Sequence, residues 1–132
     1  FDSLWVAVGS GGTLAGLVRS LHPSIQIRAV AVMKDYQPVK KRLSKYLNQE
    51  QSNRICWVEG GWYRGFGRFR QGDVDLQLAL EKSTGILLDP VYTAKLMRRM
   101  FEAYQNNEFA DRRPLMLHTG GLQGRRSINS FL

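Results

Sequence analysis

The alternation of apolar and amphipathic segments in the first sixty residues constrains the fold more than any other feature of this sequence. A short apolar segment at residues 4–8 precedes residues 14–21, whose leucines and valine recur at the spacing of one helix face. Residues 25–33 are rich in β-branched side chains, residues 39–47 carry apolar side chains at helical spacing, and residues 55–58 are apolar again. This β-α-β-α-β order predicts an α/β fold with a parallel, helix-covered sheet.

The second half of the chain predicts further elements on either side of a loop. Residues 60–72 combine five glycines with aromatic and arginine side chains, which is typical of a loop. A helix is expected over residues 74–82, followed by a stop at Thr84-Gly85 and a very short apolar segment at residues 86–88. A last strand is expected at residues 114–117, before a polar C-terminal segment.

A second helix is expected after Asp89-Pro90. The aspartate can accept hydrogen bonds from the free amides of a first turn, and proline suits the first helical position because its missing N–H is not needed there. The side chains expected to form the buried stripe of this helix are Ala94, Met97, Phe101 and Tyr104.

Composition limits the class of protein. With 132 residues, 43% of them hydrophobic and 23% charged, residues 1–132 are expected to form a single globular α/β region. The net charge of +8 permits a polyanionic partner without identifying one. The lone cysteine, Cys56, excludes an internal disulfide and suits a reducing compartment. No apolar stretch approaches the roughly 20 residues of a membrane span, so we expect a cytoplasmic protein.

The chain enters an apolar strand within a few residues of Phe1. A buried parallel strand needs neighbouring strands and helices on both faces. We therefore expect a fragment that lacks residues upstream.

A glycine-rich turn, Gly-Ser-Gly-Gly-Thr at residues 9–13, joins the first expected strand to the first expected helix. Small residues let backbone amides face an anion there, and the helix N-terminus adds partial positive charge. The turn lacks the Gly-Lys-Ser/Thr ending of a Walker A loop, and Leu14 stands where the dinucleotide motif has its third glycine. The pattern alone fits either a tight turn or a phosphate site.

Two further motifs follow this turn along the chain. They are Leu-Asp-Pro-Val-Tyr-Thr-Ala-Lys at residues 88–95 and Leu-His-Thr-Gly-Gly-Leu-Gln-Gly at residues 117–124. In this order the three motifs resemble the 1-aminocyclopropane-1-carboxylate deaminase/D-cysteine desulfhydrase family, which are fold-type II pyridoxal-phosphate enzymes. The resemblance covers the whole chain but only the C-terminal portion of such an enzyme, and it implies the tryptophan-synthase-β-like architecture of that class.

The resemblance implies pyridoxal 5'-phosphate as cofactor, no metal, and a role for each motif. The residues implied to hold the cofactor phosphate are Gly9, Ser10, Gly11, Gly12 and Thr13. Tyr92 would face the pyridine ring and act on substrate through its hydroxyl, which makes it the implied catalytic residue. Thr119, beside Gly120, would hydrogen-bond the pyridine nitrogen. A neutral partner leaves that nitrogen largely unprotonated, which favours β-elimination.

One residue separates the two activities of the family. In the deaminase branch a glutamate follows the motif tyrosine, whereas Thr93 here favours a lyase like D-cysteine desulfhydrase, which eliminates across the α and β carbons of a D-amino acid to give pyruvate, ammonia and sulfide. The alternatives are a 1-aminocyclopropane-1-carboxylate deaminase and a non-catalytic module that binds an anion or nucleic acid. Departures from the family pattern leave the substrate open; they are Phe66, Ala94, Arg125 and Arg126.

The family also uses a lysine that this chain does not supply. That lysine bonds to the cofactor and lies upstream of the glycine-rich turn. Lys40, Lys41 and Lys45 are expected on the solvent face of a helix, and Lys95 has no such role in its motif. We therefore expect the chain alone to be inactive. Its implied partners are the missing N-terminal part of the same enzyme, a second copy in a homodimer, and a small amino-acid substrate.

The remaining candidate residues have structural interpretations. His118 has no carboxylate paired with it in sequence, His22 precedes a proline at a helix end, and Cys56 suits a small buried apolar position. The arginines and aromatic rings at residues 62–70 could bind single-stranded nucleic acid, or could border an active site and meet a carboxylate substrate.

Overall fold

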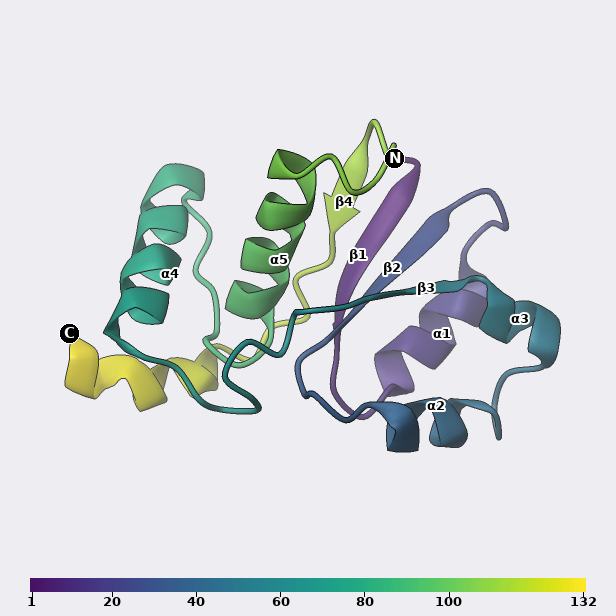
Figure 1. The fold of residues 1–132 in the computed structure, drawn as a ribbon, viewed down its shortest axis with the longest axis horizontal. Coiled ribbons are helices and arrows are strands. Elements are labelled where there is room, and N and C mark those ends of the chain that lie inside the picture. Colours follow the sequence, from purple (N-terminus) through teal and green to yellow (C-terminus); the bar gives the residue numbers. More distant parts are fainter.

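A parallel four-stranded sheet forms the centre of the computed structural model, which describes all 132 residues (Figure 1). The strands are β1 (Ser3–Val8), β2 (Gln26–Ala31), β3 (Ile55–Val58) and β4 (Pro114–Met116). They lie in the order β3-β2-β1-β4, and every neighbouring pair is parallel. The predicted α/β class and parallel sheet are therefore confirmed.

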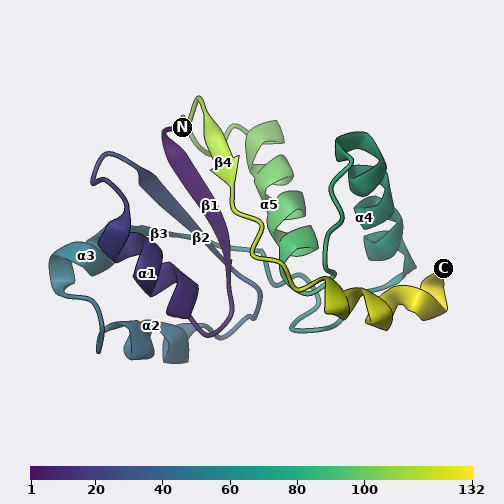
Figure 2. The ribbon, with the colours of Figure 1, turned by 180° about the vertical axis from the view of Figure 1, so that it is seen from behind.

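Five α-helices and a C-terminal 3₁₀ helix connect and cover the strands. They are α1 (Gly12–Ser20), α2 (Gln37–Leu43), α3 (Gln49–Asn53), α4 (Gln71–Thr84), α5 (Thr93–Gln105) and η1 (Leu122–Phe131). Figures 1 and 2 show α1 and α5 on opposite faces of the sheet, with α4 beside α5 and farther from the strands. No helix combines the length and apolar character that crossing a membrane requires.

Each face of the sheet has its own core because successive side chains of a strand point to opposite sides. On one face Val6 packs with Leu14 and Val18 of α1. On the other face Trp5 packs with Leu96 of α5. The helix cover predicted from the alternating segments is thus present on both faces.

The expected helix at residues 39–47 is wrong in its extent, because residues 44–47 lie outside any helix and a second short helix, α3, follows them. Helix α2 ends at Leu43, and Asn48 begins α3 with a capping box: its side chain accepts from the Gln51 amide at 2.8 Å, and the Gln51 side chain accepts from the Asn48 amide at 3.0 Å. The Asn-x-x-Gln sequence is a known helix start. Hydrophobic spacing extended the first helix four residues too far, to Leu47, and did not predict α3.

The very short apolar segment at residues 86–88 belongs to no helix or strand; Leu88 is buried, whereas Ile86 and Leu87 are exposed. None of the four residues of the expected buried stripe of α5 is fully buried, because Leu96 and Ala103 face the sheet instead. Phe101 is 53% exposed, and Ala94, Met97 and Tyr104 are half-buried. The expected loop over residues 60–72 ends two residues early, because α4 begins at Gln71. The expected helix stop at Gly85, which has a φ of 72°, is confirmed.

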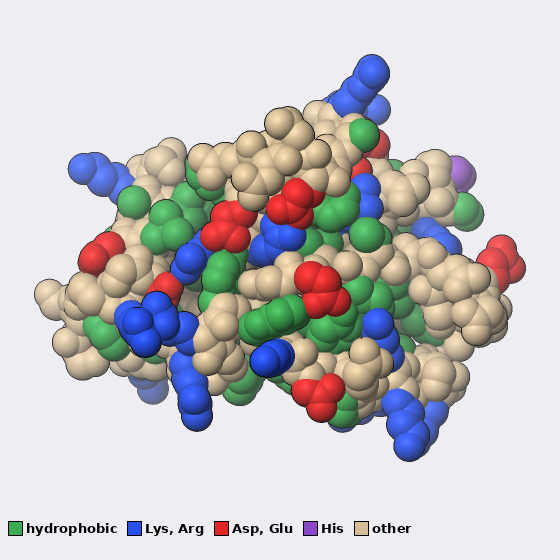
Figure 3. Space-filling view, viewed as in Figure 1, with side chains coloured by type: hydrophobic (Ala, Val, Ile, Leu, Met, Phe, Trp, Pro, Cys, Tyr) green, Lys and Arg blue, Asp and Glu red, His purple; other side chains and the backbone are tan.

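Basic side chains do not gather into one surface on the face seen in Figure 3. Lysines and arginines are scattered over it, and acidic side chains lie between them. On this face the excess positive charge therefore offers no continuous track for a polyanion.

Candidate functional site

The glycine-rich turn connects β1 to α1 at the carboxyl end of the sheet. Gly11 is the N-cap of α1 with a φ of 92°, a left-handed conformation that favours glycine. No side chain caps the helix, and its first turn contains no acidic residue. The amides of Gly12, Thr13 and Leu14 therefore lack intrahelical partners and carry the positive end of the helix dipole. An anion would satisfy them.

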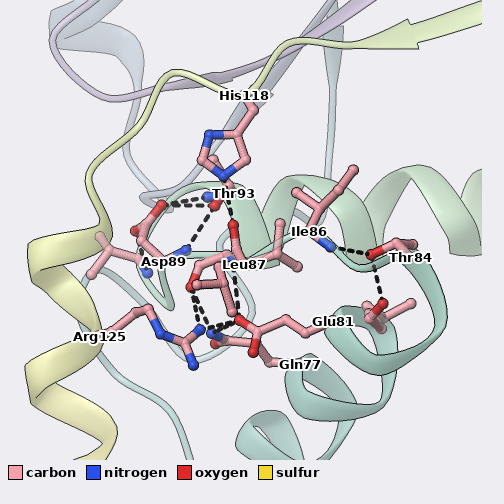
Figure 4. Close-up of polar contacts among 12 residues, drawn as sticks. Gln77, Glu81, Thr84, Ile86, Leu87, Asp89, Thr93, His118 and Arg125 are labelled. Atoms are coloured by element: carbon pink, nitrogen blue, oxygen red, sulfur yellow. Dashed lines mark hydrogen bonds and ion pairs between the residues drawn. The ribbon is translucent and has the colours of Figure 1, made fainter.

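Tyr92 is held at the start of α5 by the buried carboxylate of Asp89, which is 1% exposed. This carboxylate accepts from the amides of Val91, Tyr92 and Thr93 at 2.8 to 2.9 Å and from the Thr93 hydroxyl at 2.9 Å. Figure 4 shows the bonds between Asp89 and Thr93. The expected capping role of Asp89 is confirmed, but the helix begins at Thr93, so Pro90 lies in the preceding turn.

The Tyr92 ring lies directly over Gly9. A Cβ atom on Gly9 would stand 2.9 Å from Cε1 and 3.3 Å from the hydroxyl oxygen of Tyr92. Phe66 approaches the same ring edge-on, with 5.9 Å between ring centroids. The tyrosine is thus enclosed between the glycine turn and the loop that carries Phe66.

A cavity of about 270 Å³ lies between the glycine turn, Tyr92 and the segment after β4. Its lining includes every residue that the sequence indicated for the cofactor site: Gly9, Ser10, Gly11, Gly12, Thr13, Tyr92, Thr119 and Gly120. Segments more than eighty residues apart are thereby brought together. Four further lining residues were not indicated by the sequence: Ala7, Val8, Leu14 and Gly121.

A buried polar network fixes the segment that leads into Asp89 (Figure 4). The Glu81 carboxylate accepts from the Leu88 amide at 2.8 Å, from the Gln77 amide group at 2.9 Å and from Arg125. The Leu88 carbonyl accepts from Gln77 and Arg125 at 2.8 and 2.9 Å. Burial raises the pKa of Glu81, but the bonds from Gln77, the Leu88 amide and Arg125 together bring that pKa below its ordinary value.

This network explains Arg125, one of the two arginines that depart from the family pattern. Arg125 joins η1 to α4 and to the segment before Asp89, so it has a structural partner for its charge. Sequence reasoning did not identify the network. The signal available was Gln77 and Glu81, a polar pair four residues apart on the face of α4 that carries Val74.

His118 has the structural role expected of it. Its Nδ1 accepts from the Gly120 amide at 3.1 Å, and its Nε2 lies 2.8 Å from the Leu87 carbonyl, to which it can donate (Figure 4). Both bonds require the neutral tautomer with the proton on Nε2. The imidazole thus shapes the turn that places Thr119 and Gly120 at the cavity.

The lysines lie away from the cavity, and none is among its lining residues. Lys41 and Lys45 are exposed as expected, but Lys40 is half-buried because its ammonium lies over the rings of Tyr36 and Trp57. Lys95 is 6% exposed, which the sequence did not indicate.

The loop arginines do not line the cavity either. Arg64 pairs with Asp73 at 3.3 Å, and Arg98 of α5 pairs with the same carboxylate at 2.7 Å. The loop approaches the site through Phe66 rather than through its cations.

Comparisons with known proteins find relatives of this chain, two of which are described below, whereas no family model matches it. A Thermotoga maritima protein named "putative 1-aminocyclopropane-1-carboxylate deaminase" is 34% identical over 135 residues, covering 94% of this chain. A crystal structure described as an ACC deaminase homologue superimposes over 100% of this chain with a TM-score of 0.79 and 26% identity. The chain spans 42% and 44% of the lengths of these relatives.

Proposed function

We propose that this chain, which belongs to the 1-aminocyclopropane-1-carboxylate deaminase family, provides the cofactor-phosphate site of a pyridoxal-phosphate-dependent lyase. The family expected from the three motifs is confirmed by both relatives. One observation carries the proposal of a cofactor site: the glycine turn, Tyr92 and Thr119 line a single cavity at the N-terminus of α1.

The residues present fit the phosphate of the cofactor. The first amides of α1 have no side-chain cap and no acidic neighbour in the first turn. A Cβ on Gly12 would meet no atom within 4 Å, so the backbone there is open to an approaching group. Gly12, Thr13 and Leu14 would donate hydrogen bonds to phosphate oxygens, as helix N-termini commonly do.

Tyr92 and Thr119 would act at the rest of the cofactor and at the substrate. Tyr92 would present its ring to the pyridine and its hydroxyl to the reacting amino acid, where it can hold or move a proton. Thr119 would hydrogen-bond the pyridine nitrogen. When bound, pyridoxal phosphate supplies an electron sink for the α-carbon of an amino acid.

The chain supplies the cavity but no lysine within it. We therefore propose that these residues alone catalyse no turnover. In the complete enzyme, the upstream part would supply the lysine that bonds to the cofactor, and a second copy of the enzyme would complete a homodimer. Assays accordingly use the full-length gene product that contains these 132 residues.

The proposed reaction is elimination of sulfide from D-cysteine. With one water molecule, D-cysteine gives pyruvate, ammonia and hydrogen sulfide. Thr93 supports this choice over deamination, since its hydroxyl is fully buried and bonded to Asp89 rather than free to serve as an acid or base. The names of both relatives favour the second candidate, deamination of 1-aminocyclopropane-1-carboxylate, which with one water molecule gives 2-oxobutanoate and ammonia.

Incubating the full-length gene product with each substrate separates the two candidates. Sulfide and pyruvate from D-cysteine support the first, and 2-oxobutanoate from 1-aminocyclopropane-1-carboxylate supports the second. L-Cysteine serves as the matched control for the stereochemistry. Absence of all these products would contradict the proposed lyase.

A cofactor titration tests the phosphate site independently of turnover. Pyridoxal 5'-phosphate should bind the cofactor-free protein, inorganic phosphate should compete with it, and pyridoxal without the phosphate should bind about 100-fold more weakly because it leaves the α1 amides unpaired. Equal affinity for pyridoxal and its phosphate would refute the assigned site.

A further inference from the structure

The side chain of Lys95 is the buried cation that the proposed function leaves without a role. It points from α5 toward the loop that carries Phe66, and its ammonium is 3.1 Å from the Trp62 carbonyl and 2.5 Å from the Gly65 carbonyl. No carboxylate lies within ion-pair distance of it, since Lys95 is absent from all six ion pairs of the chain. Burial lowers its pKa, and the more distant Asp73 opposes that effect only in part.

Holding a loop with a buried ammonium that has no counter-ion costs desolvation free energy. Removing an amine from water disfavours its charged form, and two carbonyl oxygens satisfy only two of its three N–H donors. An apolar side chain of similar length would avoid this penalty. The placement therefore calls for an explanation beyond the packing of α5.

The two carbonyls that the Lys95 ammonium contacts belong to one turn of the loop. The Gly65 amide donates to the Trp62 carbonyl at 2.8 Å, which closes a turn, and Gly65 has a φ of 110°. Lys95 donates to both ends of this turn. Because a peptide unit is planar, fixing the Gly65 carbonyl also fixes the plane in which the Phe66 amide lies.

Phe66 connects this turn to the candidate catalytic residue. Its ring is 53% exposed, so no core holds it, yet it meets the Tyr92 ring edge-on at 5.9 Å between centroids. Tyr92 precedes Lys95 by three residues, at the start of the same helix. The first turn of α5 thus carries both residues: Tyr92 lines the cavity, and Lys95 contacts the loop whose Phe66 packs against Tyr92.

We infer that Lys95 is a positioning residue for Tyr92: its ammonium holds the turn at Trp62–Gly65 so that Phe66 keeps the Tyr92 ring aligned over the cavity. This inference rests on the proposed role of Tyr92. Lys95 does not touch the cavity, so its effect reaches the reaction only through Phe66 and Tyr92.

The test uses the full-length gene product and the variants Lys95→Met, Phe66→Ala and the double variant. Lys95→Met keeps the length of the side chain and removes its charge. Lys82→Met, at an exposed position in the last turn of α4, is the matched control. For each protein we would measure kcat, KM, the Kd for pyridoxal phosphate, and trypsin cleavage after Arg64 and Arg68 in the cofactor-free state.

Lys95→Met should lower kcat by about 10-fold, because displacing a reacting group by a fraction of an ångström has effects of this order. The cofactor Kd should change by less than about threefold, since the phosphate amides are untouched. Trypsin should cleave the loop faster. Phe66→Ala should lower kcat similarly, and the double variant should be no slower than the slower single variant, because both changes break the same connection.

Two results would overturn the inference while leaving the proposed function intact. One is an unchanged kcat in Lys95→Met in a protein that binds the cofactor and turns over substrate. The other is a double variant whose losses multiply to about 100-fold, which indicates two independent structural defects. Failure of the wild-type protein to bind pyridoxal phosphate would instead overturn the proposed function and this inference with it.

Discussion

Gly9→Ala tests the closest contact in the site, the one between the glycine turn and the Tyr92 ring. The new Cβ would lie 2.9 Å from Cε1 of Tyr92. Two carbon atoms prefer a separation of at least about 3.5 Å, so the ring must move by roughly 0.6 Å or the turn must yield by as much. The φ of Gly9 is not positive, so alanine introduces no backbone strain there.

The ring has little freedom to absorb this shift. Asp89 holds the Tyr92 amide at 2.8 Å, and Phe66 lies against the ring. A displacement of this size at a reacting group is expected to lower kcat by about 10- to 100-fold. The amides of Gly12, Thr13 and Leu14 are unchanged, so the Kd for pyridoxal phosphate should stay within about fivefold of wild type.

The assay is steady-state turnover of the full-length gene product together with a cofactor titration, and Gly16→Ala is the matched control. A Cβ on Gly16, in the middle of α1, meets no atom within 4 Å. That variant should keep full activity and gain about 0.5 to 1 kcal/mol of stability from the better helix propensity of alanine. If Gly9→Ala turns over at the wild-type rate, the proposed placement of Tyr92 over the turn is refuted.

Three further outcomes follow from the same geometry. Tyr92→Phe should lower turnover by about 100-fold or more and spare the cofactor Kd, which substrate kinetics and a titration would check; unchanged turnover removes its catalytic role. Asp89→Ala should cost about 2 to 4 kcal/mol in urea unfolding, because it leaves three amides and a hydroxyl without their acceptor. Glu81 has a folded-state pKa below its ordinary 4.5, so its contribution to stability is present above that pH and is lost as the pH falls through the lower value. Glu81→Gln should flatten that part of the stability profile, and an unaltered acid limb would contradict the assignment.

The parts of the fold that could be predicted are those set by local chemistry. The β-branched and apolar side chains of residues 25–33 and 55–58 indicated two strands, and the structure places strands at residues 26–31 and 55–58. The glycine turn and Asp89 were recognisable because left-handed backbone and helix capping each need particular residue types. These local signals located the glycine turn, whereas Tyr92, Thr119 and Gly120 were indicated only by the resemblance to the family.

Features that depend on distant partners could not be predicted. Lysine is usually exposed, and at Lys95 the carbonyls of Trp62 and Gly65 offset the cost of burying the ammonium. Arg125 likewise forms an ion pair with Glu81, which lies 44 residues earlier in the chain. No local pattern encodes such pairs, because their energy arises from tertiary contacts.

The pairing of β4 with β1 has a consequence for the order in which parts of the protein can fold. Ser3 pairs with Pro114, and Leu4 with Leu115, so the first strand of this chain receives its second neighbour only after more than a hundred further residues have been synthesised. Thr119 and Gly120, which close the cavity, follow directly on β4. Contacts so far apart in sequence are slow to form. The glycine turn therefore depends on local contacts, whereas the opposite wall of the cavity depends on the pairing of β4 with β1, so the proposed cofactor site is complete only when the sheet is complete.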